Sequence, residues 1–471
     1  METPSIVANA LNSHSNTFNC PSVKASLVEN QVGNNNDSLP LYIPGSIDLD
    51  RMLNENPPTF RYFKDYFVHL LHLINYIPSR NKDLLDGDGF TPIHKKTLQD
   101  KNRHYRKYIN YLIEHGVIIE DKQYITGEKS QGLKFCERYN TPTEPVIIKK
   151  KTLIKSLTNY DKTINTEKTG ELCFLSEWFS KDLKVDIEKA LSIVKKEYLD
   201  DLNNPEVKNP MLSLNSKLIP IQKIYRQEFE FFIDNSGNRL HTNITNLKSN
   251  LRECLTYEDK RLISIDIKNS QPFLAMALLD IEVFRRMNIR DKIPNSYIDL
   301  DKLEKLIESV ENKPDVVLFK SLVSSGKFYE EFGKILYANG MIDLVDCEIP
   351  RDKVKNIVFE AIYSSNKNNS PTAKLFKNTF KNVHKVFAVI KKGRGKKPHA
   401  ALAILLQRIE ADLVLHKACK IISEAKPHIP LFTIHDNIAT TNEHKSFVKS
   451  ILKKVLRRNI GVKPKLKVEH W

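Results

Sequence analysis

The chain has 471 residues, enough for roughly three domains, so its length excludes a small scaffold held together by disulfides or a structural metal. Lys and Arg number 73 against 57 Asp and Glu, and the resulting net charge of +16 favours a polyanionic partner such as nucleic acid. The sequence contains no run of about 20 apolar residues and no signal-peptide pattern, so we expect a cytoplasmic protein without a membrane partner. The six cysteines are widely spaced without a CxxC pair, which suggests neither a disulfide framework nor a zinc site.

The N-terminal part of the chain combines a polar leader with a helical module. Residues 1–40 are rich in Asn and Ser and lack a sustained period, which predicts a disordered leader. The pattern that follows predicts a helix with Phe60, Phe63, Phe67, Leu70, Leu71 and Ile74 on one face, helices over 95–103 and 104–116, and β-like runs over 117–121 and 122–135. Gly116 is suited to end the helix over 104–116.

A basic helix followed by a β-hairpin is the order of a winged helix, so residues 57–140 are predicted to form a winged-helix-like module. In that fold one helix enters the major groove of DNA while the hairpin touches phosphates. The candidate DNA contacts are Lys101, Arg103, Arg106 and Lys107. The alternative is a helical packing module whose basic face is merely solvated. Winged-helix folds also mediate protein contacts, so the shape alone does not establish DNA binding.

Residues 141–235 contain a Lys-rich stretch and a long helical pattern from Leu175 to Leu199. Two interpretations stay open for this region. It is either thumb-like, meaning helices that grip a duplex by its backbone, or a connecting helical layer.

A first candidate metal ligand ends a predicted strand in the run RLISIDIKNSQPFLAMALL. The period of two places Asp266 on the face opposite Ile263, Ile265 and Ile267, so its carboxylate leaves the core where the strand ends. An acid in this position can hold a metal ion. The alternative is that Asp266 caps the helix that follows.

A second candidate acid lies in the run HIPLFTIHDNIATTNEH, where two apolar strands flank His435, Asp436 and Asn437. Asp-Asn is also good chemistry for an ordinary tight turn. A His-Asp pair at the tip of an apolar hairpin, far downstream of an Asp that ends a strand, is instead an arrangement by which two carboxylates can hold two Mg²⁺ ions about 3.5–4 Å apart. One ion would activate a hydroxyl, and the other would neutralise a leaving pyrophosphate.

The run PRDKVKNIVFEAIYSS predicts a helix that starts near Pro350. Arg351, Lys355, Phe359 and Tyr363 follow at steps of four, so at about 100° per residue they share a stripe about 120° wide. Two cations can take a triphosphate while the aromatic rings pack against a base and sugar. An amphipathic core helix would explain the aromatic residues but not the cations on their face.

These elements, in this order, resemble motifs A, B and C of the family A DNA polymerases and the related single-subunit phage-type RNA polymerases. Two further segments are similar to parts of that family, GNRLHTNITNLKSNLRECL before the first Asp and HAALAILLQRIEADLVLHKA before the hairpin. The resemblance spans residues 236–442. It implies an α+β fold with a right-hand polymerase palm and fingers over residues 236–471.

The resemblance also implies roles for individual residues. Asp266 and Asp436 would bind two Mg²⁺ ions, for which Mn²⁺ can substitute, and His435 would orient the primer end. The implied nucleotide-binding residues are Arg351, Lys355, Phe359 and Tyr363. The implied primer contacts are Arg239 and Gln407. Apart from the resemblance, the charge of a basic loop makes Lys396 and Lys397 candidate contacts to template or primer phosphates, the alternative being a solvated surface.

Three positions depart from the family pattern. Gln271, or Phe273 in a shifted alignment, stands where a family A DNA polymerase has the Glu that helps exclude ribonucleotides. Ser364 replaces a Gly and Asn437 replaces a Glu. The choice of sugar therefore stays open.

The sequence accordingly predicts a template-directed nucleic-acid polymerase that acts on a primer-template duplex and nucleoside triphosphates. DNA synthesis is favoured over RNA synthesis. No DxE-bearing strand with suitably spaced acids precedes the polymerase-like region, so we expect no proofreading. The alternatives are a single-subunit RNA polymerase and a non-enzymatic DNA-binding protein, such as a replication initiator or mobile-element protein with a degenerate palm. The oligomeric state is left open.

Overall fold

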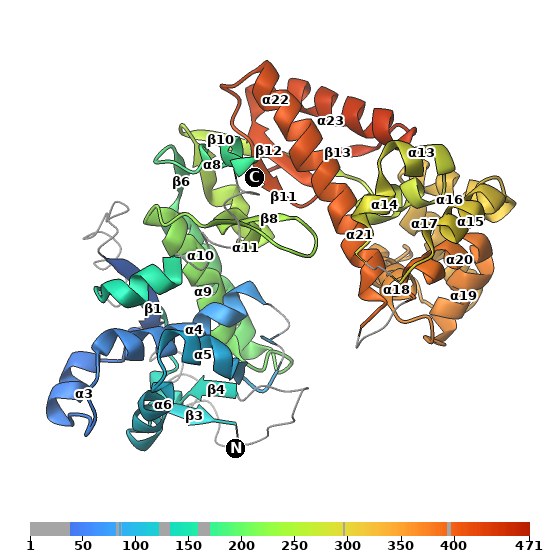
Figure 1. Ribbon diagram of the computed structural model, residues 1–471. Helices are drawn as coiled ribbons and strands as arrows, with labels where there is room; N and C mark the ends of the chain where they lie inside the picture. The colour runs from blue at the N-terminus through green and yellow to red at the C-terminus, as the bar shows by residue number, and fades with distance from the viewer. Residues whose placement is uncertain are drawn as a thin grey trace. The chain divides into compact units, whose positions relative to one another are not determined.

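The computed structural model describes residues 38–81, 84, 85, 87–121, 132–158, 170–294, 297–392 and 397–471. They form two compact units (Figure 1). Unit 1 comprises the described residues up to 158 together with 179–231 and 242–259, and unit 2 comprises 170–178, 232–241 and the described residues from 260 onward. The predicted leader lies outside the described residues, except that Leu39 and Pro40 already belong to a strand.

Unit 1 mixes helices with short antiparallel strands. Its helices include α3 (Leu49–Glu55), α4 (Lys64–Arg80), α5 (Lys95–Lys101), α6 (Tyr105–Glu114), η2 (Glu137–Tyr139), α9 (Ile187–Asn203), α10 (Pro210–Tyr225), α11 (Asn243–Asn246) and η3 (Ser249–Cys254). Its strands are β1 (Leu39–Pro44), β2 (Thr91–Pro92), β3 (Ile118–Glu120), β4 (Gly132–Phe135), β5 (Thr143–Ile148), β6 (Leu183–Val185) and β9 (Leu255–Tyr257).

The N-terminal module contains the predicted helices and hairpin in the predicted order (Figure 1). Helix α6 ends at Glu114, and Gly116 follows with φ of 64°, the left-handed conformation that suits glycine. Strand β4 pairs antiparallel with both β3 and β2, so the module contains a three-stranded sheet. Phe67 and Leu71 of α4 pack with Tyr108 and Leu112 of α6 in the core of this module.

Two details of the sequence prediction are wrong in this unit. Phe60 and Phe63 precede α4, which begins at Lys64, and Phe63 is exposed. The helical pattern from Leu175 to Leu199 is interrupted by β6, which pairs with β9. Helix α9 begins only after Asp186, whose side chain accepts the backbone N–H of Lys189 at 3.0 Å and thereby caps the helix.

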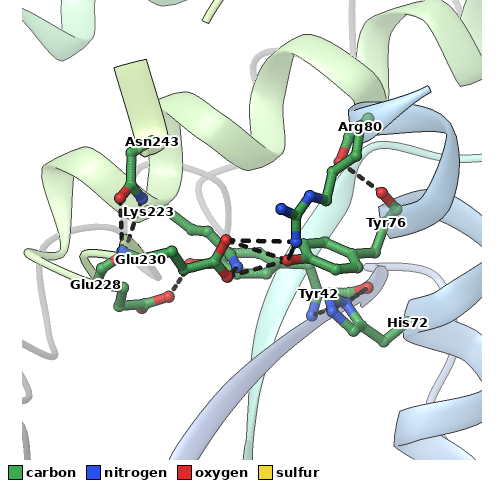
Figure 2. Close-up of polar contacts among 9 residues, drawn as sticks. Tyr42, His72, Tyr76, Arg80, Lys223, Glu228, Glu230 and Asn243 are labelled. Atoms are coloured by element: carbon green, nitrogen blue, oxygen red, sulfur yellow. Dashed lines mark hydrogen bonds and ion pairs between the residues drawn. The ribbon is translucent and has the colours of Figure 1, made fainter. Parts of the chain in front are cut away.

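A buried polar network connects β1 and α4 to α10 and the residues after it (Figure 2). Glu230 accepts hydrogen bonds from the Tyr76 hydroxyl at 3.1 Å and from the Lys223 ammonium. Glu228 accepts one from the Tyr42 hydroxyl. Burial lowers the pKa of Lys223, but Glu230 opposes this effect and the pKa lies above its ordinary value. The ion pair is therefore charged inside unit 1.

We expect Lys223→Met to lower the free energy of unfolding by about 1.5–3 kcal/mol, because the partly buried Glu230 would lose its ammonium donor and keep only the Tyr76 hydroxyl and, at 4.0 Å, Arg80. The double variant Lys223→Met/Glu230→Leu removes both charges and should recover most of this loss. Urea unfolding of the two variants measures the difference. Lys196→Met, at an exposed position of α9, serves as the control and should change stability by no more than about 0.5 kcal/mol.

Unit 2 contains a sheet and a larger set of helices. Its helices are α8 (Cys173–Ser176), α12 (Ser270–Ala275), η4 (Met276–Leu278), α13 (Ile281–Arg286), α14 (Ile289–Lys292), α15 (Leu300–Val310), α16 (Pro314–Ser325), α17 (Phe328–Ala338), α18 (Arg351–Tyr363), α19 (Pro371–Thr379), α20 (Lys381–Ile390), α21 (Ala400–Ala411), the π-helical η5 (Asp412–Cys419), α22 (Lys420–Ala425), η6 (Asn442–His444) and α23 (Lys445–Ile460). Its strands are β10 (Lys260–Ile267), β11 (Phe432–Ile434), β12 (Asn437–Thr441) and β13 (Leu466–His470), and a hairpin of β7 (Phe231–Ile233) and β8 (Leu240–Thr242) lies at its boundary.

The two strands that carry the candidate carboxylates are neighbours in the sheet. Strand β10 pairs antiparallel with β12 and with β13, and β12 forms a hairpin with β11. The predicted strand before Asp266 and the predicted hairpin around Asp436 are therefore both present. The mixed α+β architecture predicted from the sequence is confirmed. In the described part of the chain, no helix is long and apolar enough to span a membrane.

An aromatic core supports the helices around α18. Phe319, Phe328, Phe332, Phe376 and Phe380 are fully buried and come from α16, α17, α19 and the start of α20. Ring centroids in this cluster lie 5.1 Å apart for Phe319 and Phe328 and 5.7 Å apart for Phe332 and Phe376. Helix α18 packs against α17 and α19, so this core fixes its position.

Candidate active site

Asp266 lies near the C-terminal end of β10, on the face that the period of two predicted. Ile263, Ile265 and Ile267 are buried, whereas Asp266 is only half-buried. The residue that caps α12 is Asn269, so the alternative role of Asp266 as a helix cap is wrong. The strand register places Asp266 opposite Asn437 on β12.

Asp436 lies in the two-residue turn between β11 and β12. The preceding residue, His435, has φ of 56°, a left-handed conformation that is uncommon for residues other than glycine. The Ser270 hydroxyl donates a hydrogen bond to the Asp436 carboxylate. Because Asp266 lies opposite Asn437, the register brings the two carboxylates to the same end of the sheet.

Burial and charge act together on this pair of acids. Burial raises the pKa of Asp266 to about 7, and the negative charge of Asp436 adds to the effect, whereas Lys467 and Lys355 oppose it. Burial also raises the pKa of Asp436, against the opposing effects of the Ser270 hydroxyl and Lys355. Burial therefore disfavours the charged form of both carboxylates, and their mutual repulsion adds to this effect.

Helix α18 presents its cationic stripe to this pair across a cleft of about 390 Å³. Pro350 is the N-cap of α18 and not part of its first turn. The residues that line the cleft include Asp266, Asp436, Arg351, Lys355 and Phe359, together with Lys268, Asn269, Ser270, Gly326, Tyr329, Glu330 and Lys467. The structure therefore brings both predicted acids and three of the four predicted helix residues into one space.

Tyr363, the fourth residue of the stripe, does not line the cleft. It contacts a neighbouring side chain through its hydroxyl. Its ring centroid lies 5.6 Å from that of Phe359, and its hydroxyl donates a hydrogen bond to Oε1 of Gln271 at 2.7 Å. Gln271 is one of the two residues, with Phe273, that can stand where the resembling family has a Glu. Of these two, Gln271 is in direct contact with the helix stripe.

The sequence analysis missed two residues of α17 that hold Arg351. Oε1 of Glu330 accepts a hydrogen bond from Nε of Arg351 at 3.1 Å, and the Arg351 guanidinium lies 5.1 Å from the centroid of the Tyr329 ring. Burial raises the pKa of Tyr329 well above its ordinary value. No spacing in the sequence relates these residues to α18, because the contact depends on how two helices pack.

Arg239 reaches the site from the hairpin of β7 and β8. The Asp234 carboxylate accepts the backbone N–H groups of Ser236, Gly237 and Arg239 at 2.6–2.9 Å, which fixes the turn. A Cβ atom on Gly237 would lie only 2.5 Å from Oε1 of Gln407, so glycine permits α21 to approach this turn closely. Arg239 and Gln407, both implied primer contacts, thus lie on neighbouring elements.

A buried acid that the sequence did not single out connects Arg239 to the helix stripe. Glu410 of α21 is 1% exposed and accepts hydrogen bonds from Nε and Nη2 of Arg239 at 2.8 and 3.0 Å. It also accepts one from Nε2 of Gln271 at 2.7 Å, and Gln271 in turn accepts the Tyr363 hydroxyl. Burial raises the pKa of Glu410 to about 8, although Arg239 lowers it.

This raised pKa predicts a specific pH dependence of stability. An acid whose folded pKa exceeds its unfolded value of about 4.5 contributes stability at low pH that is lost as the pH rises through the folded pKa. Glu410→Gln cannot ionise, so relative to the variant the wild type should lose about 1.4 kcal/mol per pH unit between those two values. Urea unfolding at several pH values measures this difference.

The site fits a divalent cation. Among the described residues, neither Asp266 nor Asp436 has a Lys, Arg or His nitrogen within 4.0 Å, and no larger cluster of His, Cys, Asp and Glu gathers elsewhere in those ranges. Mg²⁺ is commonly held by one or two carboxylates together with substrate phosphates, so two acids suffice. Asp266 and Asp436 would hold two such ions, of which one would supply an activated hydroxyl and the other would neutralise a leaving pyrophosphate.

The remaining predicted contacts lie outside this cleft. The His435 ring centroid lies 6.1 Å from that of His241 on β8. Lys397 is exposed, and Lys396 lies outside the described residues. In unit 1, Arg106 forms a bidentate ion pair with Glu120, and Nζ of Lys101 donates to the backbone oxygen of Ser156. The other two basic residues of that helix region, Arg103 and Lys107, are exposed.

No protein-family model and no curated protein matches the chain. Among solved structures, it is similar to the POL domain of Pol1 from M. smegmatis, solved in complex with DNA primer-template and dNTP. The sequence identity is 11%, the match covers 68% of this chain and 72% of that chain, and the TM-score is 0.34.

Proposed function

We propose that this chain is a template-directed nucleic-acid polymerase of the family A type, which adds nucleotides to a primer 3′ end. The observation that carries the proposal is the cleft in unit 2. There two mutually repelling carboxylates, Asp266 and Asp436, face a helix with two cations, Arg351 and Lys355, and an aromatic ring. This combination suits a metal-bound polyphosphate attached to a flat base.

The proposal gives each side chain of α18 a separate task. Lys355 and Arg351 bind the phosphates of the incoming nucleotide, since charge-assisted hydrogen bonds to phosphate are among the strongest available. Phe359 and Tyr363 pack against its base and sugar. Glu330 and Tyr329 hold Arg351 in a single orientation before the nucleotide arrives. Preorganisation of this kind lowers the entropic cost of binding.

On the primer side, we assign the terminal base pair to Arg239 and Gln407, and the primer end to His435. The template strand is assigned to Lys396 and Lys397. Glu410 holds the Arg239 guanidinium and also contacts Gln271, which bonds to Tyr363. A change at Arg239 can therefore reach Tyr363 of the nucleotide pocket through the hydrogen bonds of Glu410 and Gln271.

Primer extension with Mg²⁺ tests the proposal, using dNTPs and rNTPs in parallel on DNA and RNA templates. We expect metal-dependent incorporation, with dNTPs favoured. A preference for rNTPs would move the chain to the single-subunit RNA polymerases. Duplex binding without any incorporation would favour the non-enzymatic DNA-binding alternative. No 3′–5′ degradation of a mismatched primer is expected.

For the N-terminal module, we propose that it is a DNA-binding winged helix. Its order of helix, strand, two helices and two strands supports this assignment, as does the sheet in which β4 lies between β2 and β3. Among the four candidate contacts, Arg103 and Lys107 are exposed, whereas Arg106 is paired with Glu120. Arg103 and Lys107 therefore carry most of the phosphate contact in this proposal, and Lys101 and Arg106 less.

We expect the double variant Arg103→Gln/Lys107→Gln to reduce the slope of log K against log salt for duplex binding. The slope should fall in magnitude by about 1.8, at about 0.9 for each of two lost phosphate contacts. A salt titration of duplex binding by the full-length proteins measures the slope. Arg106→Gln is the matched comparison, because its guanidinium already pairs with Glu120, and its slope should change less. Equal slopes for the double variant and the wild type would assign the module to protein contacts or packing.

A further inference from the structure

A second cavity of unit 2, of about 220 Å³, lies beyond the C-terminal end of α18. Ala361 of α18 lines it, and at about 100° per residue this position lies roughly 200° around the helix from Phe359, which lines the active-site cleft. The two cavities therefore lie on opposite faces of α18. The other lining residues are Ser364, Ser365, Asn366, Asn368, Asn369, Ala373, Lys374, Lys377, Asn378, His384 and Lys391.

The lining of this cavity is positively charged. It includes Lys374, Lys377 and Lys391 but no Asp or Glu. The nearest acid along the chain, Glu360, is occupied, because its Oε1 accepts hydrogen bonds from Asn368 and Ser370 at 2.9 Å each. Within the described ranges, none of the three lysines has a carboxylate oxygen within 4.0 Å.

Lys391 is the unusual member of this set, because it is 3% exposed. Its ammonium carries three N–H donors and donates to the backbone oxygen of Ser364 at 3.1 Å. Burial lowers the pKa of Lys391 to about 8. A buried cation is costly unless an anion accompanies it.

The pKa of His384 reflects the positive charge of the same cavity. Burial, together with the charges of Lys391 and Lys377, lowers the pKa of His384 to about 4. An imidazole between two cations keeps its neutral form, and an anion bound beside it would favour the protonated form. The structure thus contains a natural probe of charge in this cavity.

We propose that this cavity binds a phosphate group, carried either by a nucleic-acid strand or by a free phosphate compound. Lys391 lies at its base, Lys374 and Lys377 are exposed at its rim, and Asn and Ser side chains supply further donors. At about 30 Å³ per water molecule, 220 Å³ is room for several waters or one small anion.

Helix capping alone explains only part of this arrangement. The hydrogen bond from Lys391 to Ser364 caps the C-terminal end of α18, where a cation is favourable. It does not explain why Lys374 and Lys377 of α19 line the same hollow. A phosphate group accounts for all three lysines and for the absence of acids among the lining residues.

The first test follows the imidazole of His384 by NMR of the full-length protein labelled at histidine, with inorganic phosphate compared with chloride at equal ionic strength. Phosphate binding should raise the pKa of His384 by about 1 or more, because an anion close by opposes the two lysines. Lys391→Met should abolish this rise. Lys377→Gln should reduce the rise in the His384 pKa. Because Lys377 is exposed, this variant still tests the proposal if Lys391→Met fails to fold.

Lys385→Gln is the matched control. Lys385 is an exposed lysine of α20 that does not line the cavity, so the rise should be unchanged. The absence of a rise in the wild type with both inorganic phosphate and the oligothymidylate described below would overturn the proposal. A rise that persists in both Lys391→Met and Lys377→Gln would also overturn it, because the anion would then bind elsewhere.

The second arm replaces inorganic phosphate by an unphosphorylated oligothymidylate, which offers only phosphodiesters. If a nucleic-acid strand is the source of the phosphate, the oligothymidylate should raise the pKa of His384. The double variant Lys377→Gln/Lys391→Met should then reduce the slope of log K against log salt for oligothymidylate binding by about 1.4, at about 0.7 per phosphate contact. If only inorganic phosphate produces the rise, the ligand is a free phosphate compound. Neither readout requires nucleotide incorporation, so the result is independent of the polymerase proposal.

Discussion

Asp266→Asn and Asp436→Asn should each lower nucleotide incorporation by at least about 10³-fold, which corresponds to roughly 4 kcal/mol of activation free energy. Each change removes one of the two charges that would hold the metal ions, while it keeps the size of the side chain. Burial already raises the pKa of both carboxylates, so the folded protein should tolerate a neutral amide at either position. Single-turnover primer extension measures the loss.

Duplex binding serves as the internal reference for these variants and should stay within a few-fold of the wild type. Asp343→Asn is the matched control, because Asp343 is an exposed acid of unit 2 outside the cleft. It should incorporate nucleotides at the wild-type rate. Incorporation within tenfold of wild type by both Asp266→Asn and Asp436→Asn would remove these residues from the active site.

Lys355→Ala should raise the KM for the nucleotide by about 10- to 150-fold, since a charge-assisted contact contributes about 1.5–3 kcal/mol. Arg351→Ala should act in the same direction but less, because the Arg351 guanidinium divides its hydrogen bonds between Glu330 and the cleft. Steady-state extension over a range of nucleotide concentrations separates KM from kcat.

Lys353→Ala is the control for this helix, because Lys353 is exposed on α18 and does not line the cleft. It removes the same charge and the same length of side chain, and it should leave the KM unchanged. If Lys355→Ala unfolds the protein without altering the nucleotide dependence of the remaining activity, the stripe belongs to the core and not to a binding site.

Local pattern was enough to place the main candidate residues. The period of two in β10 correctly predicted the face of Asp266, because successive side chains of a strand alternate between faces whatever lies around them. The step of four in α18 correctly predicted that Arg351, Lys355 and Phe359 share a face, because helix geometry fixes that relation. The same reasoning failed for residues 175–199, where the strand β6 interrupts a helical pattern because it pairs with β9.

The tertiary structure alone decided which partners these residues meet. Glu410 and Arg239 are 171 positions apart in the chain, and Tyr363 and Gln271 are 92 apart, so no spacing relates them. The raised pKa of Asp266 likewise arises from burial and from Asp436, which only the pairing of β10 with β12 brings near. The sequence by itself determined which face of its own strand or helix each functional side chain occupies. Packing determined the charge, the burial and the hydrogen bonds of that side chain, because these depend on segments that meet only after folding.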